Sequence, residues 1–193
     1  MRIKTLSIIV FLMLVFVTID VANAQTILYS DSWGLHKYYA IQDPVPWPNA
    51  TDRIHSLLGP NYYLATITSQ EEQDFIADFI NVPSPVDYYF LGGYQDPTGL
   101  QPPLQQPWED WNWVTGEKWD YTNWNTGEPN DAGPESYLMI YSHVLNQKWN
   151  DSNEFHGQGY IAETVIPEPG TILLLGSGFL GLGILGWFRK RKA

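Results

Sequence analysis

The stretch WNWVTGEKWDYTNWNTGEPN, residues 111–130, holds four tryptophans and ends in a Glu-Pro-Asn triplet. It lies within a longer segment, residues 97–134, that is rich in Pro, Gly, Asn and Trp and shows little helical or strand periodicity. A stretch of this length without periodicity inside a compact domain is usually either functional or disordered. The tryptophans argue against disorder, because disordered segments are poor in aromatic residues. The sequence therefore predicts a long, ordered and functional loop.

Composition limits what the whole chain can be. Its 193 residues allow one ordinary domain with some processing or linker sequence. A hydrophobic share of 44% is enough to build a core. The formal net charge of −11 disfavours nucleic acid as a partner, since acidic proteins repel phosphate backbones. The chain contains no cysteine, which removes disulfides, thiolate metal ligands and thiol nucleophiles together.

Around the loop, the sequence of residues 25–166 has a mixed helix and strand character. A helix is expected over residues 48–58, with Pro48 near its first turn. A second helix is expected to start at the capping box formed by Ser69 and Glu72 and to end before Pro83. Strands are expected at residues 37–41, 62–67, 88–91, 137–141, 147–150 and 159–163. Helices followed by loop-rich antiparallel strands indicate an α+β domain.

Acidic and amide side chains follow the tryptophans. Three carboxylates and two carboxamides converge if the strands at 137–141 and 147–150 form a hairpin; they belong to Glu128, Asn130, Glu135, Asn150 and Asp151. This set holds only hard oxygen donors, which suit Ca²⁺ and disfavour zinc or copper. A cis peptide bond before Pro129 would let Glu128 and Asn130 flank one ion. On chemistry alone the alternative is a solvated acidic loop, because Pro, Asn, Asp and Gly are common turn residues.

A series of spaced motifs occurs in one order along the chain: LATI at 64–67, SQEE at 69–72, LGGY at 91–94, WNWVTGE at 111–117, YTNW at 121–124, GEPN at 127–130, WND at 149–151 and YIAE at 160–163. Together they resemble a C-type lectin domain over about residues 36–163. The resemblance implies two helices that flank two small antiparallel sheets, with a long loop that bears the ligand site. Trp111, Trp113 and Trp124 fall in motifs that pack this loop onto the core.

The resemblance also implies roles for the acidic and amide residues. In that family the Glu-Pro-Asn triplet, a later Glu and the Asn-Asp pair coordinate one Ca²⁺, and the same residues hold a sugar. The implied ligands here are Glu128, Asn130, Glu135, Asn150 and Asp151. Glu followed by Asn is the order associated with mannose, glucose or fucose-like diols. The alternative is a protein-binding or structural module with the same fold. An enzyme is not expected, because the sequence offers no nucleophile, base and orienting group together.

The chain departs from the family at the positions of its four usual half-cystines, which hold Ile54, Tyr137, Glu154 and Ala162. Ile54 and Ala162 can replace one bridge by apolar packing, whereas Tyr137 and Glu154 suggest no simple exchange. Removing a disulfide costs roughly 2–5 kcal/mol in small domains, so other interactions must supply the stability. The tryptophan-rich core and bound Ca²⁺ are the candidates.

Both ends of the chain are expected to be processing segments. Residues 1–24 have a short basic start, an apolar run and an Ala-Asn-Ala pattern at 22–24, which is typical of a cleaved signal peptide. At the other end, residues 171–188 contain no charge and are followed by four basic residues. That pattern predicts a membrane helix with a cytoplasmic C-terminus, and the alternative to processing is an ordinary anchor.

The triplet Pro167, Glu168 and Pro169 stands directly before this apolar segment. Triplet, apolar helix and basic tail together resemble the PEP-CTERM sorting signal of Gram-negative bacteria, which covers residues 167–193. In that family the membrane protease exosortase is thought to cut near the triplet. The resemblance implies an exported protein that is held at the inner membrane and then sorted to the cell surface or matrix.

Overall fold

The structure is a computed structural model that describes residues 26–95, 107–142 and 146–167. The expected signal peptide, residues 1–24, and the expected membrane helix, residues 171–188, lie outside these ranges, as do Glu168 and Pro169. Within the ranges described, no helix is long and apolar enough to cross a membrane. In chain order the elements are β1 (Thr26–Trp33), β2 (His36–Gln42), α1 (Trp47–Leu58), β3 (Tyr63–Leu64), α2 (Gln70–Ile80), β4 (Tyr88–Gln95), β5 (Trp111–Trp113), β6 (Tyr137–Tyr141), β7 (Trp149–Ser152) and β8 (Gly159–Val165).

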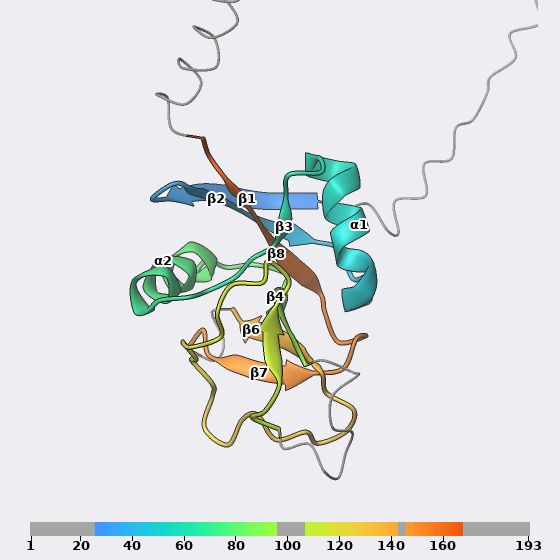
Figure 1. Cartoon of the computed structure of the whole chain (residues 1–193). Helices are drawn as coiled ribbons and strands as arrows, with labels where there is room; N and C mark the ends of the chain where they lie inside the picture. The colour runs from blue at the N-terminus through green and yellow to red at the C-terminus, as the bar shows by residue number, and fades with distance from the viewer. Residues whose placement is uncertain (1–25, 96–106, 143–145, 168–193) are drawn as a thin grey trace, which may run out of the picture.

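The strands form one mixed sheet in the order β1-β2-β8-β4-β6-β7, with β3 paired to β8 and β5 to β4. All pairs are antiparallel except β4 and β8, which pair in parallel at Tyr89↔Gly159 and Phe90↔Tyr160. The two antiparallel groups expected from the sequence are therefore present, and this short parallel contact joins them. The upper group in Figure 1 consists of β1, β2, β3 and β8, and α1 and α2 lie beside it. The loops gather at the lower end around β6 and β7. Both ends of the described chain leave from the upper end.

Most predicted elements are confirmed within a residue or two. The Ser69 hydroxyl accepts a hydrogen bond from the backbone N–H of Glu72 at 3.1 Å, so the predicted cap begins α2. The strand expected at residues 62–67 is shorter, since only Tyr63–Leu64 pairs with β8. The next two residues still bond to β8 without extending the ladder: the backbone N–H of Ala65 donates to the carbonyl of Ile161 at 2.8 Å, and that of Thr66 donates to the buried side-chain carboxylate of Glu163 at 2.9 Å. Strands β1 and β5 were not expected from the sequence.

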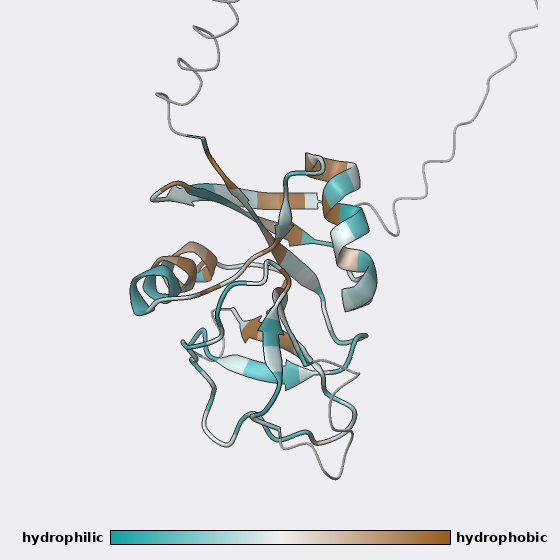
Figure 2. Ribbon diagram, in the orientation of Figure 1, coloured by the Kyte–Doolittle hydropathy of each residue, from teal (hydrophilic) through white to brown (hydrophobic). Residues whose placement is uncertain are grey.

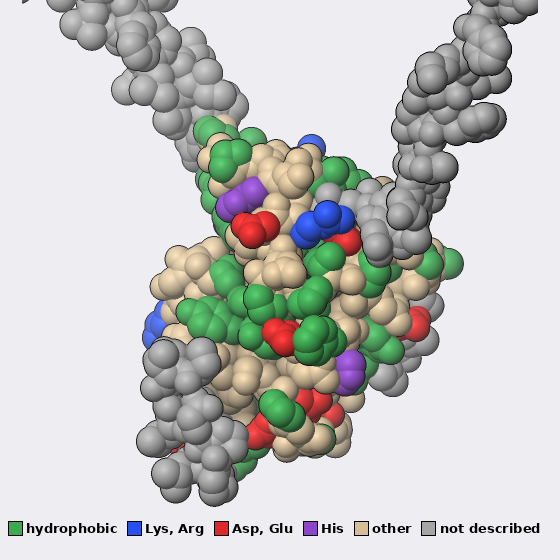
Figure 3. Space-filling model, turned by 90° about the vertical axis from the view of Figure 1, so that its right-hand side faces the viewer, with side chains coloured by type: hydrophobic (Ala, Val, Ile, Leu, Met, Phe, Trp, Pro, Cys, Tyr) green, Lys and Arg blue, Asp and Glu red, His purple; other side chains and the backbone are tan. Residues whose placement is uncertain are grey.

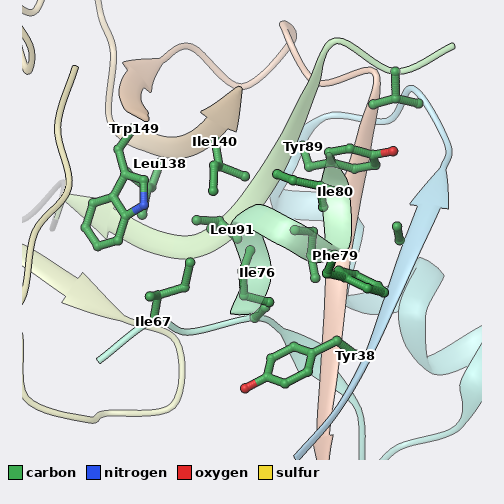
Figure 4. Packing of buried hydrophobic residues seen from close by; sticks show 14 of the residues in the cluster. Tyr38, Ile67, Ile76, Phe79, Ile80, Tyr89, Leu91, Leu138, Ile140 and Trp149 are labelled. Atoms are coloured by element: carbon green, nitrogen blue, oxygen red, sulfur yellow. The ribbon is translucent and has the colours of Figure 1, made fainter. Parts of the chain in front are cut away.

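The core consists of two clusters of buried hydrophobic residues, one on each face of the central strands: Ile161 of β8 belongs to the larger cluster, and its neighbours Tyr160 and Ala162 belong to the smaller one. The larger cluster packs α2 against β2, β4 and β6, and Figure 4 shows Ile76 and Ile80 facing Leu91 and Tyr89. Figure 2 shows the same division on the ribbon, with hydrophobic residues on one side of α2 and hydrophilic ones on the other. Periodic apolar residues thus place the helices, and the helices fix the upper half of the sheet.

The positions that hold half-cystines in C-type lectin domains are filled in two ways here. Ile54 and Ala162 are both fully buried in the smaller core cluster, which is consistent with apolar packing in place of one bridge. At the other pair, the ring of Tyr137 stacks on Trp47 with centroids 4.6 Å apart and planes 28° from parallel. The backbone N–H of Trp47 donates to the carbonyl of Glu154 at 2.9 Å. Trp47 therefore connects the two positions, a substitution that the sequence did not suggest.

Glu163, at the centre of β8, is a fully buried carboxylate that receives several hydrogen bonds. Besides the Thr66 N–H, the hydroxyl of Tyr63 donates to it at 3.3 Å, and the Nδ1 atom of His36 bonds to the same oxygen. This carboxylate joins β2, β3 and β8, so it holds the upper group of strands together.

Glu163→Gln is expected to lower the free energy of unfolding by about 1–3 kcal/mol, because the amide NH₂ then faces donors instead of accepting from them. Urea unfolding in the presence of a chelator measures the change. Glu71→Gln, on the exposed side of α2, is the matched control and is expected to leave stability within about 0.5 kcal/mol. Equal unfolding midpoints for the two variants would contradict the role given to Glu163.

Candidate metal and ligand site

The predicted ligand residues stand on β7, on the start of β6 and on the loop that crosses β7. Asn150 and Asp151 belong to β7, which pairs with β6 at Met139↔Asn150 and Leu138↔Asp151. Glu135 lies two residues before β6 begins. The loop is bound to Trp149, the first residue of β7, by two backbone hydrogen bonds. The carbonyl of Trp149 accepts from the N–H of Asn125 at 2.8 Å, and its N–H donates to the carbonyl of Asn123 at 3.0 Å. These bonds bring the Glu-Pro-Asn triplet beside the strand.

Asp151 connects the loop to the sheet. Its side chain is buried, with 1% of its surface exposed. One carboxylate oxygen accepts from the backbone N–H of Asn130 at 3.0 Å and from that of Asp131 at 2.7 Å. A carboxylate that receives backbone N–H groups in this way fixes the end of the triplet relative to β7.

The other four predicted ligands join the same network. The peptide bond between Glu128 and Pro129 is cis, as the sequence analysis suggested. The side-chain amide of Asn130 donates to the carboxylate of Glu128. The backbone N–H of Ala132 donates to the side chains of both Asn130, at 2.7 Å, and Glu135, at 2.9 Å. The amide of Asn150 donates to the backbone carbonyl of its neighbour Asp151.

The electrostatics of the network are those of uncompensated negative charge. The pKa of Glu128 is raised to about 7, first by burial and then by the nearby charges and hydrogen bonding of Asp151 and by Glu135. Burial and the charge of Asp151 also raise the pKa of Glu135. In the part of the chain that the structure describes, none of these three carboxylates forms an ion pair with Lys or Arg. A bound cation would relieve this repulsion.

The donor set fits a hard cation, because all five side chains supply carboxylate or carboxamide oxygens. No group of three His, Asp or Glu side chains stands as a preformed metal cluster among the residues described. The donor oxygens instead accept the loop's own N–H groups. A cation would bind here by replacing some of these hydrogen bonds.

A cluster of tryptophan rings packs around Trp149 of β7 and supports the loop. Trp149 is fully buried, and its indole N–H donates to the side-chain oxygen of Gln73 on α2 at 2.8 Å. Trp113 meets it edge-on at 5.8 Å between ring centroids. The ring centroid of Trp119, a residue for which the sequence predicted no role, lies 4.5 Å from that of Trp113 and 5.8 Å from that of Trp149. Trp108 lies outside this cluster and is 64% exposed.

Two comparisons of the sequence with known proteins gave a match. Residues 165–192 match the family described as the PEP-CTERM protein-sorting motif. The chain is 26% identical to mouse Lithostathine-1 over 124 residues, which cover 64% of this chain and 69% of that protein.

Solved structures share the fold at low sequence identity. The C-type lectin CEL-I from Cucumaria echinata superposes with a TM-score of 0.57 at 22% identity, over 72% of this chain and 96% of that one. The cow C-type carbohydrate-recognition domain of CD23, solved in the presence of a GlcNAc2Man3 oligosaccharide, gives 0.54 at 25% identity over 75% and 98%. A calcium-independent type II antifreeze protein gives 0.56 at 20% identity over 70% and 91%.

Proposed function

We propose that this chain, which has the C-type lectin-like fold and a PEP-CTERM sorting motif, binds carbohydrate through a calcium ion. The proposed calcium ligands are Glu128, Asn130, Glu135, Asn150 and Asp151, and all but Asp151 also contact the sugar. The observation that carries the proposal is the gathering of three carboxylates, none of which forms an ion pair with Lys or Arg among the residues described, in one network with two carboxamides. Such a network is costly in charge repulsion unless a cation binds.

The chemistry of the residues suits a diol. Calcium accepts two neighbouring hydroxyl oxygens as ligands, which completes its usual set of oxygens. Each carboxylate then accepts a hydroxyl proton, while each carboxamide N–H donates to a hydroxyl oxygen. Glu128 before Asn130 is the order expected for mannose, glucose or fucose-type sugars. A shallow site of this kind binds one sugar at about millimolar strength, so useful attachment requires many copies on a surface.

The placement of the site supports a role at the cell surface. Strand β8 ends at Val165, so the folded domain runs directly into the sorting motif. Figure 1 shows that the chain ends leave opposite the loops that carry the site. We propose that residues 1–24 are removed on export, that residues 25–166 form the working domain, and that residues 167–193 hold it in the inner membrane until exosortase acts. The site then faces away from the membrane.

Calcium titration by calorimetry, followed by a glycan array with and without chelator, tests the proposal. We expect saturable calcium binding and a chelator-sensitive signal for mannose, glucose or fucose-type glycans. Absence of both the calcium heat and the chelator-sensitive signal would overturn the proposal.

A protein-binding or structural module is the second candidate, because the loop already closes through its own hydrogen bonds. The similarity to a calcium-independent antifreeze protein is consistent with it. Glu128→Gln combined with Asn130→Asp reverses the order of donor and acceptor at the triplet. Cell-surface attachment that is unchanged by this double variant would favour the structural module over the lectin.

Calcium affinity is expected to fall as the pH decreases below about 7, because the pKa of Glu128 in the metal-free protein is raised to about 7. Below that pH a proton must leave before the carboxylate can bind, which lowers the apparent affinity by up to about tenfold per pH unit. Titrations between about pH 8 and about pH 6 measure the slope. A constant affinity across this range would contradict a role for Glu128 as a ligand.

A further inference from the structure

A hollow lies beside the proposed calcium site and is lined mainly by aromatic and proline side chains. Its volume is about 700 Å³. The walls come from the start of α1, the end of β4, the start of β6 and the segment after β7, and they include Trp47, Tyr94, Tyr137 and Phe155. Figure 3, which views the right-hand side of Figure 1, shows hydrophobic side chains gathered across the middle of this face and acidic ones grouped below them.

Trp47 forms a fixed wall of this hollow. Its indole N–H donates to the carbonyl of Leu91 at 2.8 Å, and its backbone N–H donates to Glu154. Its ring stacks on Tyr137 and lies 5.8 Å from Tyr94. Both N–H groups of Trp47 are therefore already bonded, and the rings are held in place before any ligand arrives. A rigid aromatic wall costs little entropy on binding.

Phe155 connects the hollow to the proposed calcium site. A neighbouring hollow of about 530 Å³ is lined by two of the proposed ligands, Glu135 and Asn150, and Phe155 lines both hollows. Ser136, the residue after Glu135, lines the aromatic hollow. Phe155 is 71% exposed, although the Asn153 side chain holds its backbone N–H at 2.9 Å. A molecule held at the calcium site can therefore extend over Phe155 into the aromatic hollow.

The lining indicates what the hollow takes. Aromatic rings and prolines contact the C–H face of a pyranose ring, while its hydroxyl groups need polar partners at the edge. Ser136, Asn153 and Glu154 supply such partners beside the rings. Burial and then the charge of Glu154 raise the pKa of Tyr137, and the same Glu154 carboxylate disfavours an anionic sugar here. A neutral sugar ring fits both the walls and the charge.

We propose that the hollow formed by Trp47, Tyr94, Tyr137 and Phe155 is a second sugar subsite, which binds the ring next to the one on calcium. This inference rests on the proposed function. The protein then selects neutral oligosaccharides over single sugars, and two residues of the hollow, Tyr137 and Glu154, stand at positions that hold half-cystines in C-type lectin domains.

The test compares a monosaccharide with its oligosaccharides. Calorimetry with the domain in calcium measures methyl α-mannoside, mannobiose and mannotriose. The oligosaccharides are expected to bind about tenfold more tightly than the monosaccharide, as one stacked aromatic contact suggests. Tyr94→Ala is expected to remove that gain while calcium and monosaccharide affinity stay unchanged. Phe155→Ala, at an exposed position where folding is not at risk, is also expected to remove the gain.

Trp108→Ala is the matched control, because Trp108 is exposed and does not line the hollow. It is expected to keep the full gain. Equal affinity of the wild type for the monosaccharide and the oligosaccharides would overturn the subsite while leaving the proposed function intact. So would a gain that survives both Tyr94→Ala and Phe155→Ala. Absence of any calcium-dependent sugar binding would overturn the proposed function, and the subsite with it.

Discussion

Asp151→Asn is expected to lower calcium affinity by about 150- to 5,000-fold and to abolish calcium-dependent glycan binding. Asp151 is buried, and its carboxylate both contributes charge to the proposed ion and accepts the backbone N–H groups of Asn130 and Asp131. An asparagine at this position loses the charge and turns an NH₂ group toward those donors. Loss of a buried charged partner costs about 3–5 kcal/mol, which corresponds to the stated factor. Calorimetric titration with calcium measures it.

Two further variants separate loss of the ion from damage to the loop. Glu128→Gln leaves the bonds between Asp151 and the loop in place, so its expected loss of about 10- to 100-fold reflects the missing charge alone. Asp120→Asn is the control, since Asp120 pairs with Lys118 on the same loop and lies outside the ligand network. Calcium binding by Asp151→Asn at wild-type affinity would refute the assignment of the site.

The sequence predicted those parts of the fold that have a strong local pattern. The cap at Ser69 and the apolar positions of α2 are set by residues three or four apart, so the helix could be placed without tertiary contacts. Strand β1 escaped prediction because it is an edge strand with no buried residue, and an edge strand can lack hydrophobic alternation. The parallel contact of Tyr89 and Phe90 with β8 depends on how two distant strands meet, which no local pattern records.

The candidate site divides in the same way. Glu128, Asn130 and Asp151 stand in short motifs of recognisable spacing, and the structure brings them into one network. The aromatic hollow had no such signal. Trp47, at the start of α1, and Phe155, after β7, lie far apart in the sequence, and they come together through the hydrogen bond between Trp47 and Glu154. The absence of cysteine shows in the sequence at which positions the packing must differ from that of C-type lectin domains. Which side chains pack there could be learned only from the structure.

Trp149→Ala is expected to lower the free energy of unfolding by about 3–5 kcal/mol, the largest change in stability that we expect from one substitution. The side chain is fully buried, and the rings of Trp113, Trp119 and Trp124 surround it at 5.8 Å between centroids. Its removal leaves a cavity and deprives the side-chain oxygen of the buried Gln73 of the donor that it accepts from. Urea unfolding, with chelator present, measures the loss.

The same substitution is expected to weaken the proposed calcium site, although Trp149 supplies no ligand. The backbone of Trp149 holds the loop at Asn123 and Asn125, and the next two residues are Asn150 and Asp151. A shift of β7 into the cavity would therefore move ligands on both the strand and the loop. Trp108→Ala removes an exposed tryptophan and is expected to change stability by less than about 0.5 kcal/mol. If Trp149→Ala unfolded at the same urea concentration as Trp108→Ala, the tryptophan cluster would not be what supports the loop in this cysteine-free domain.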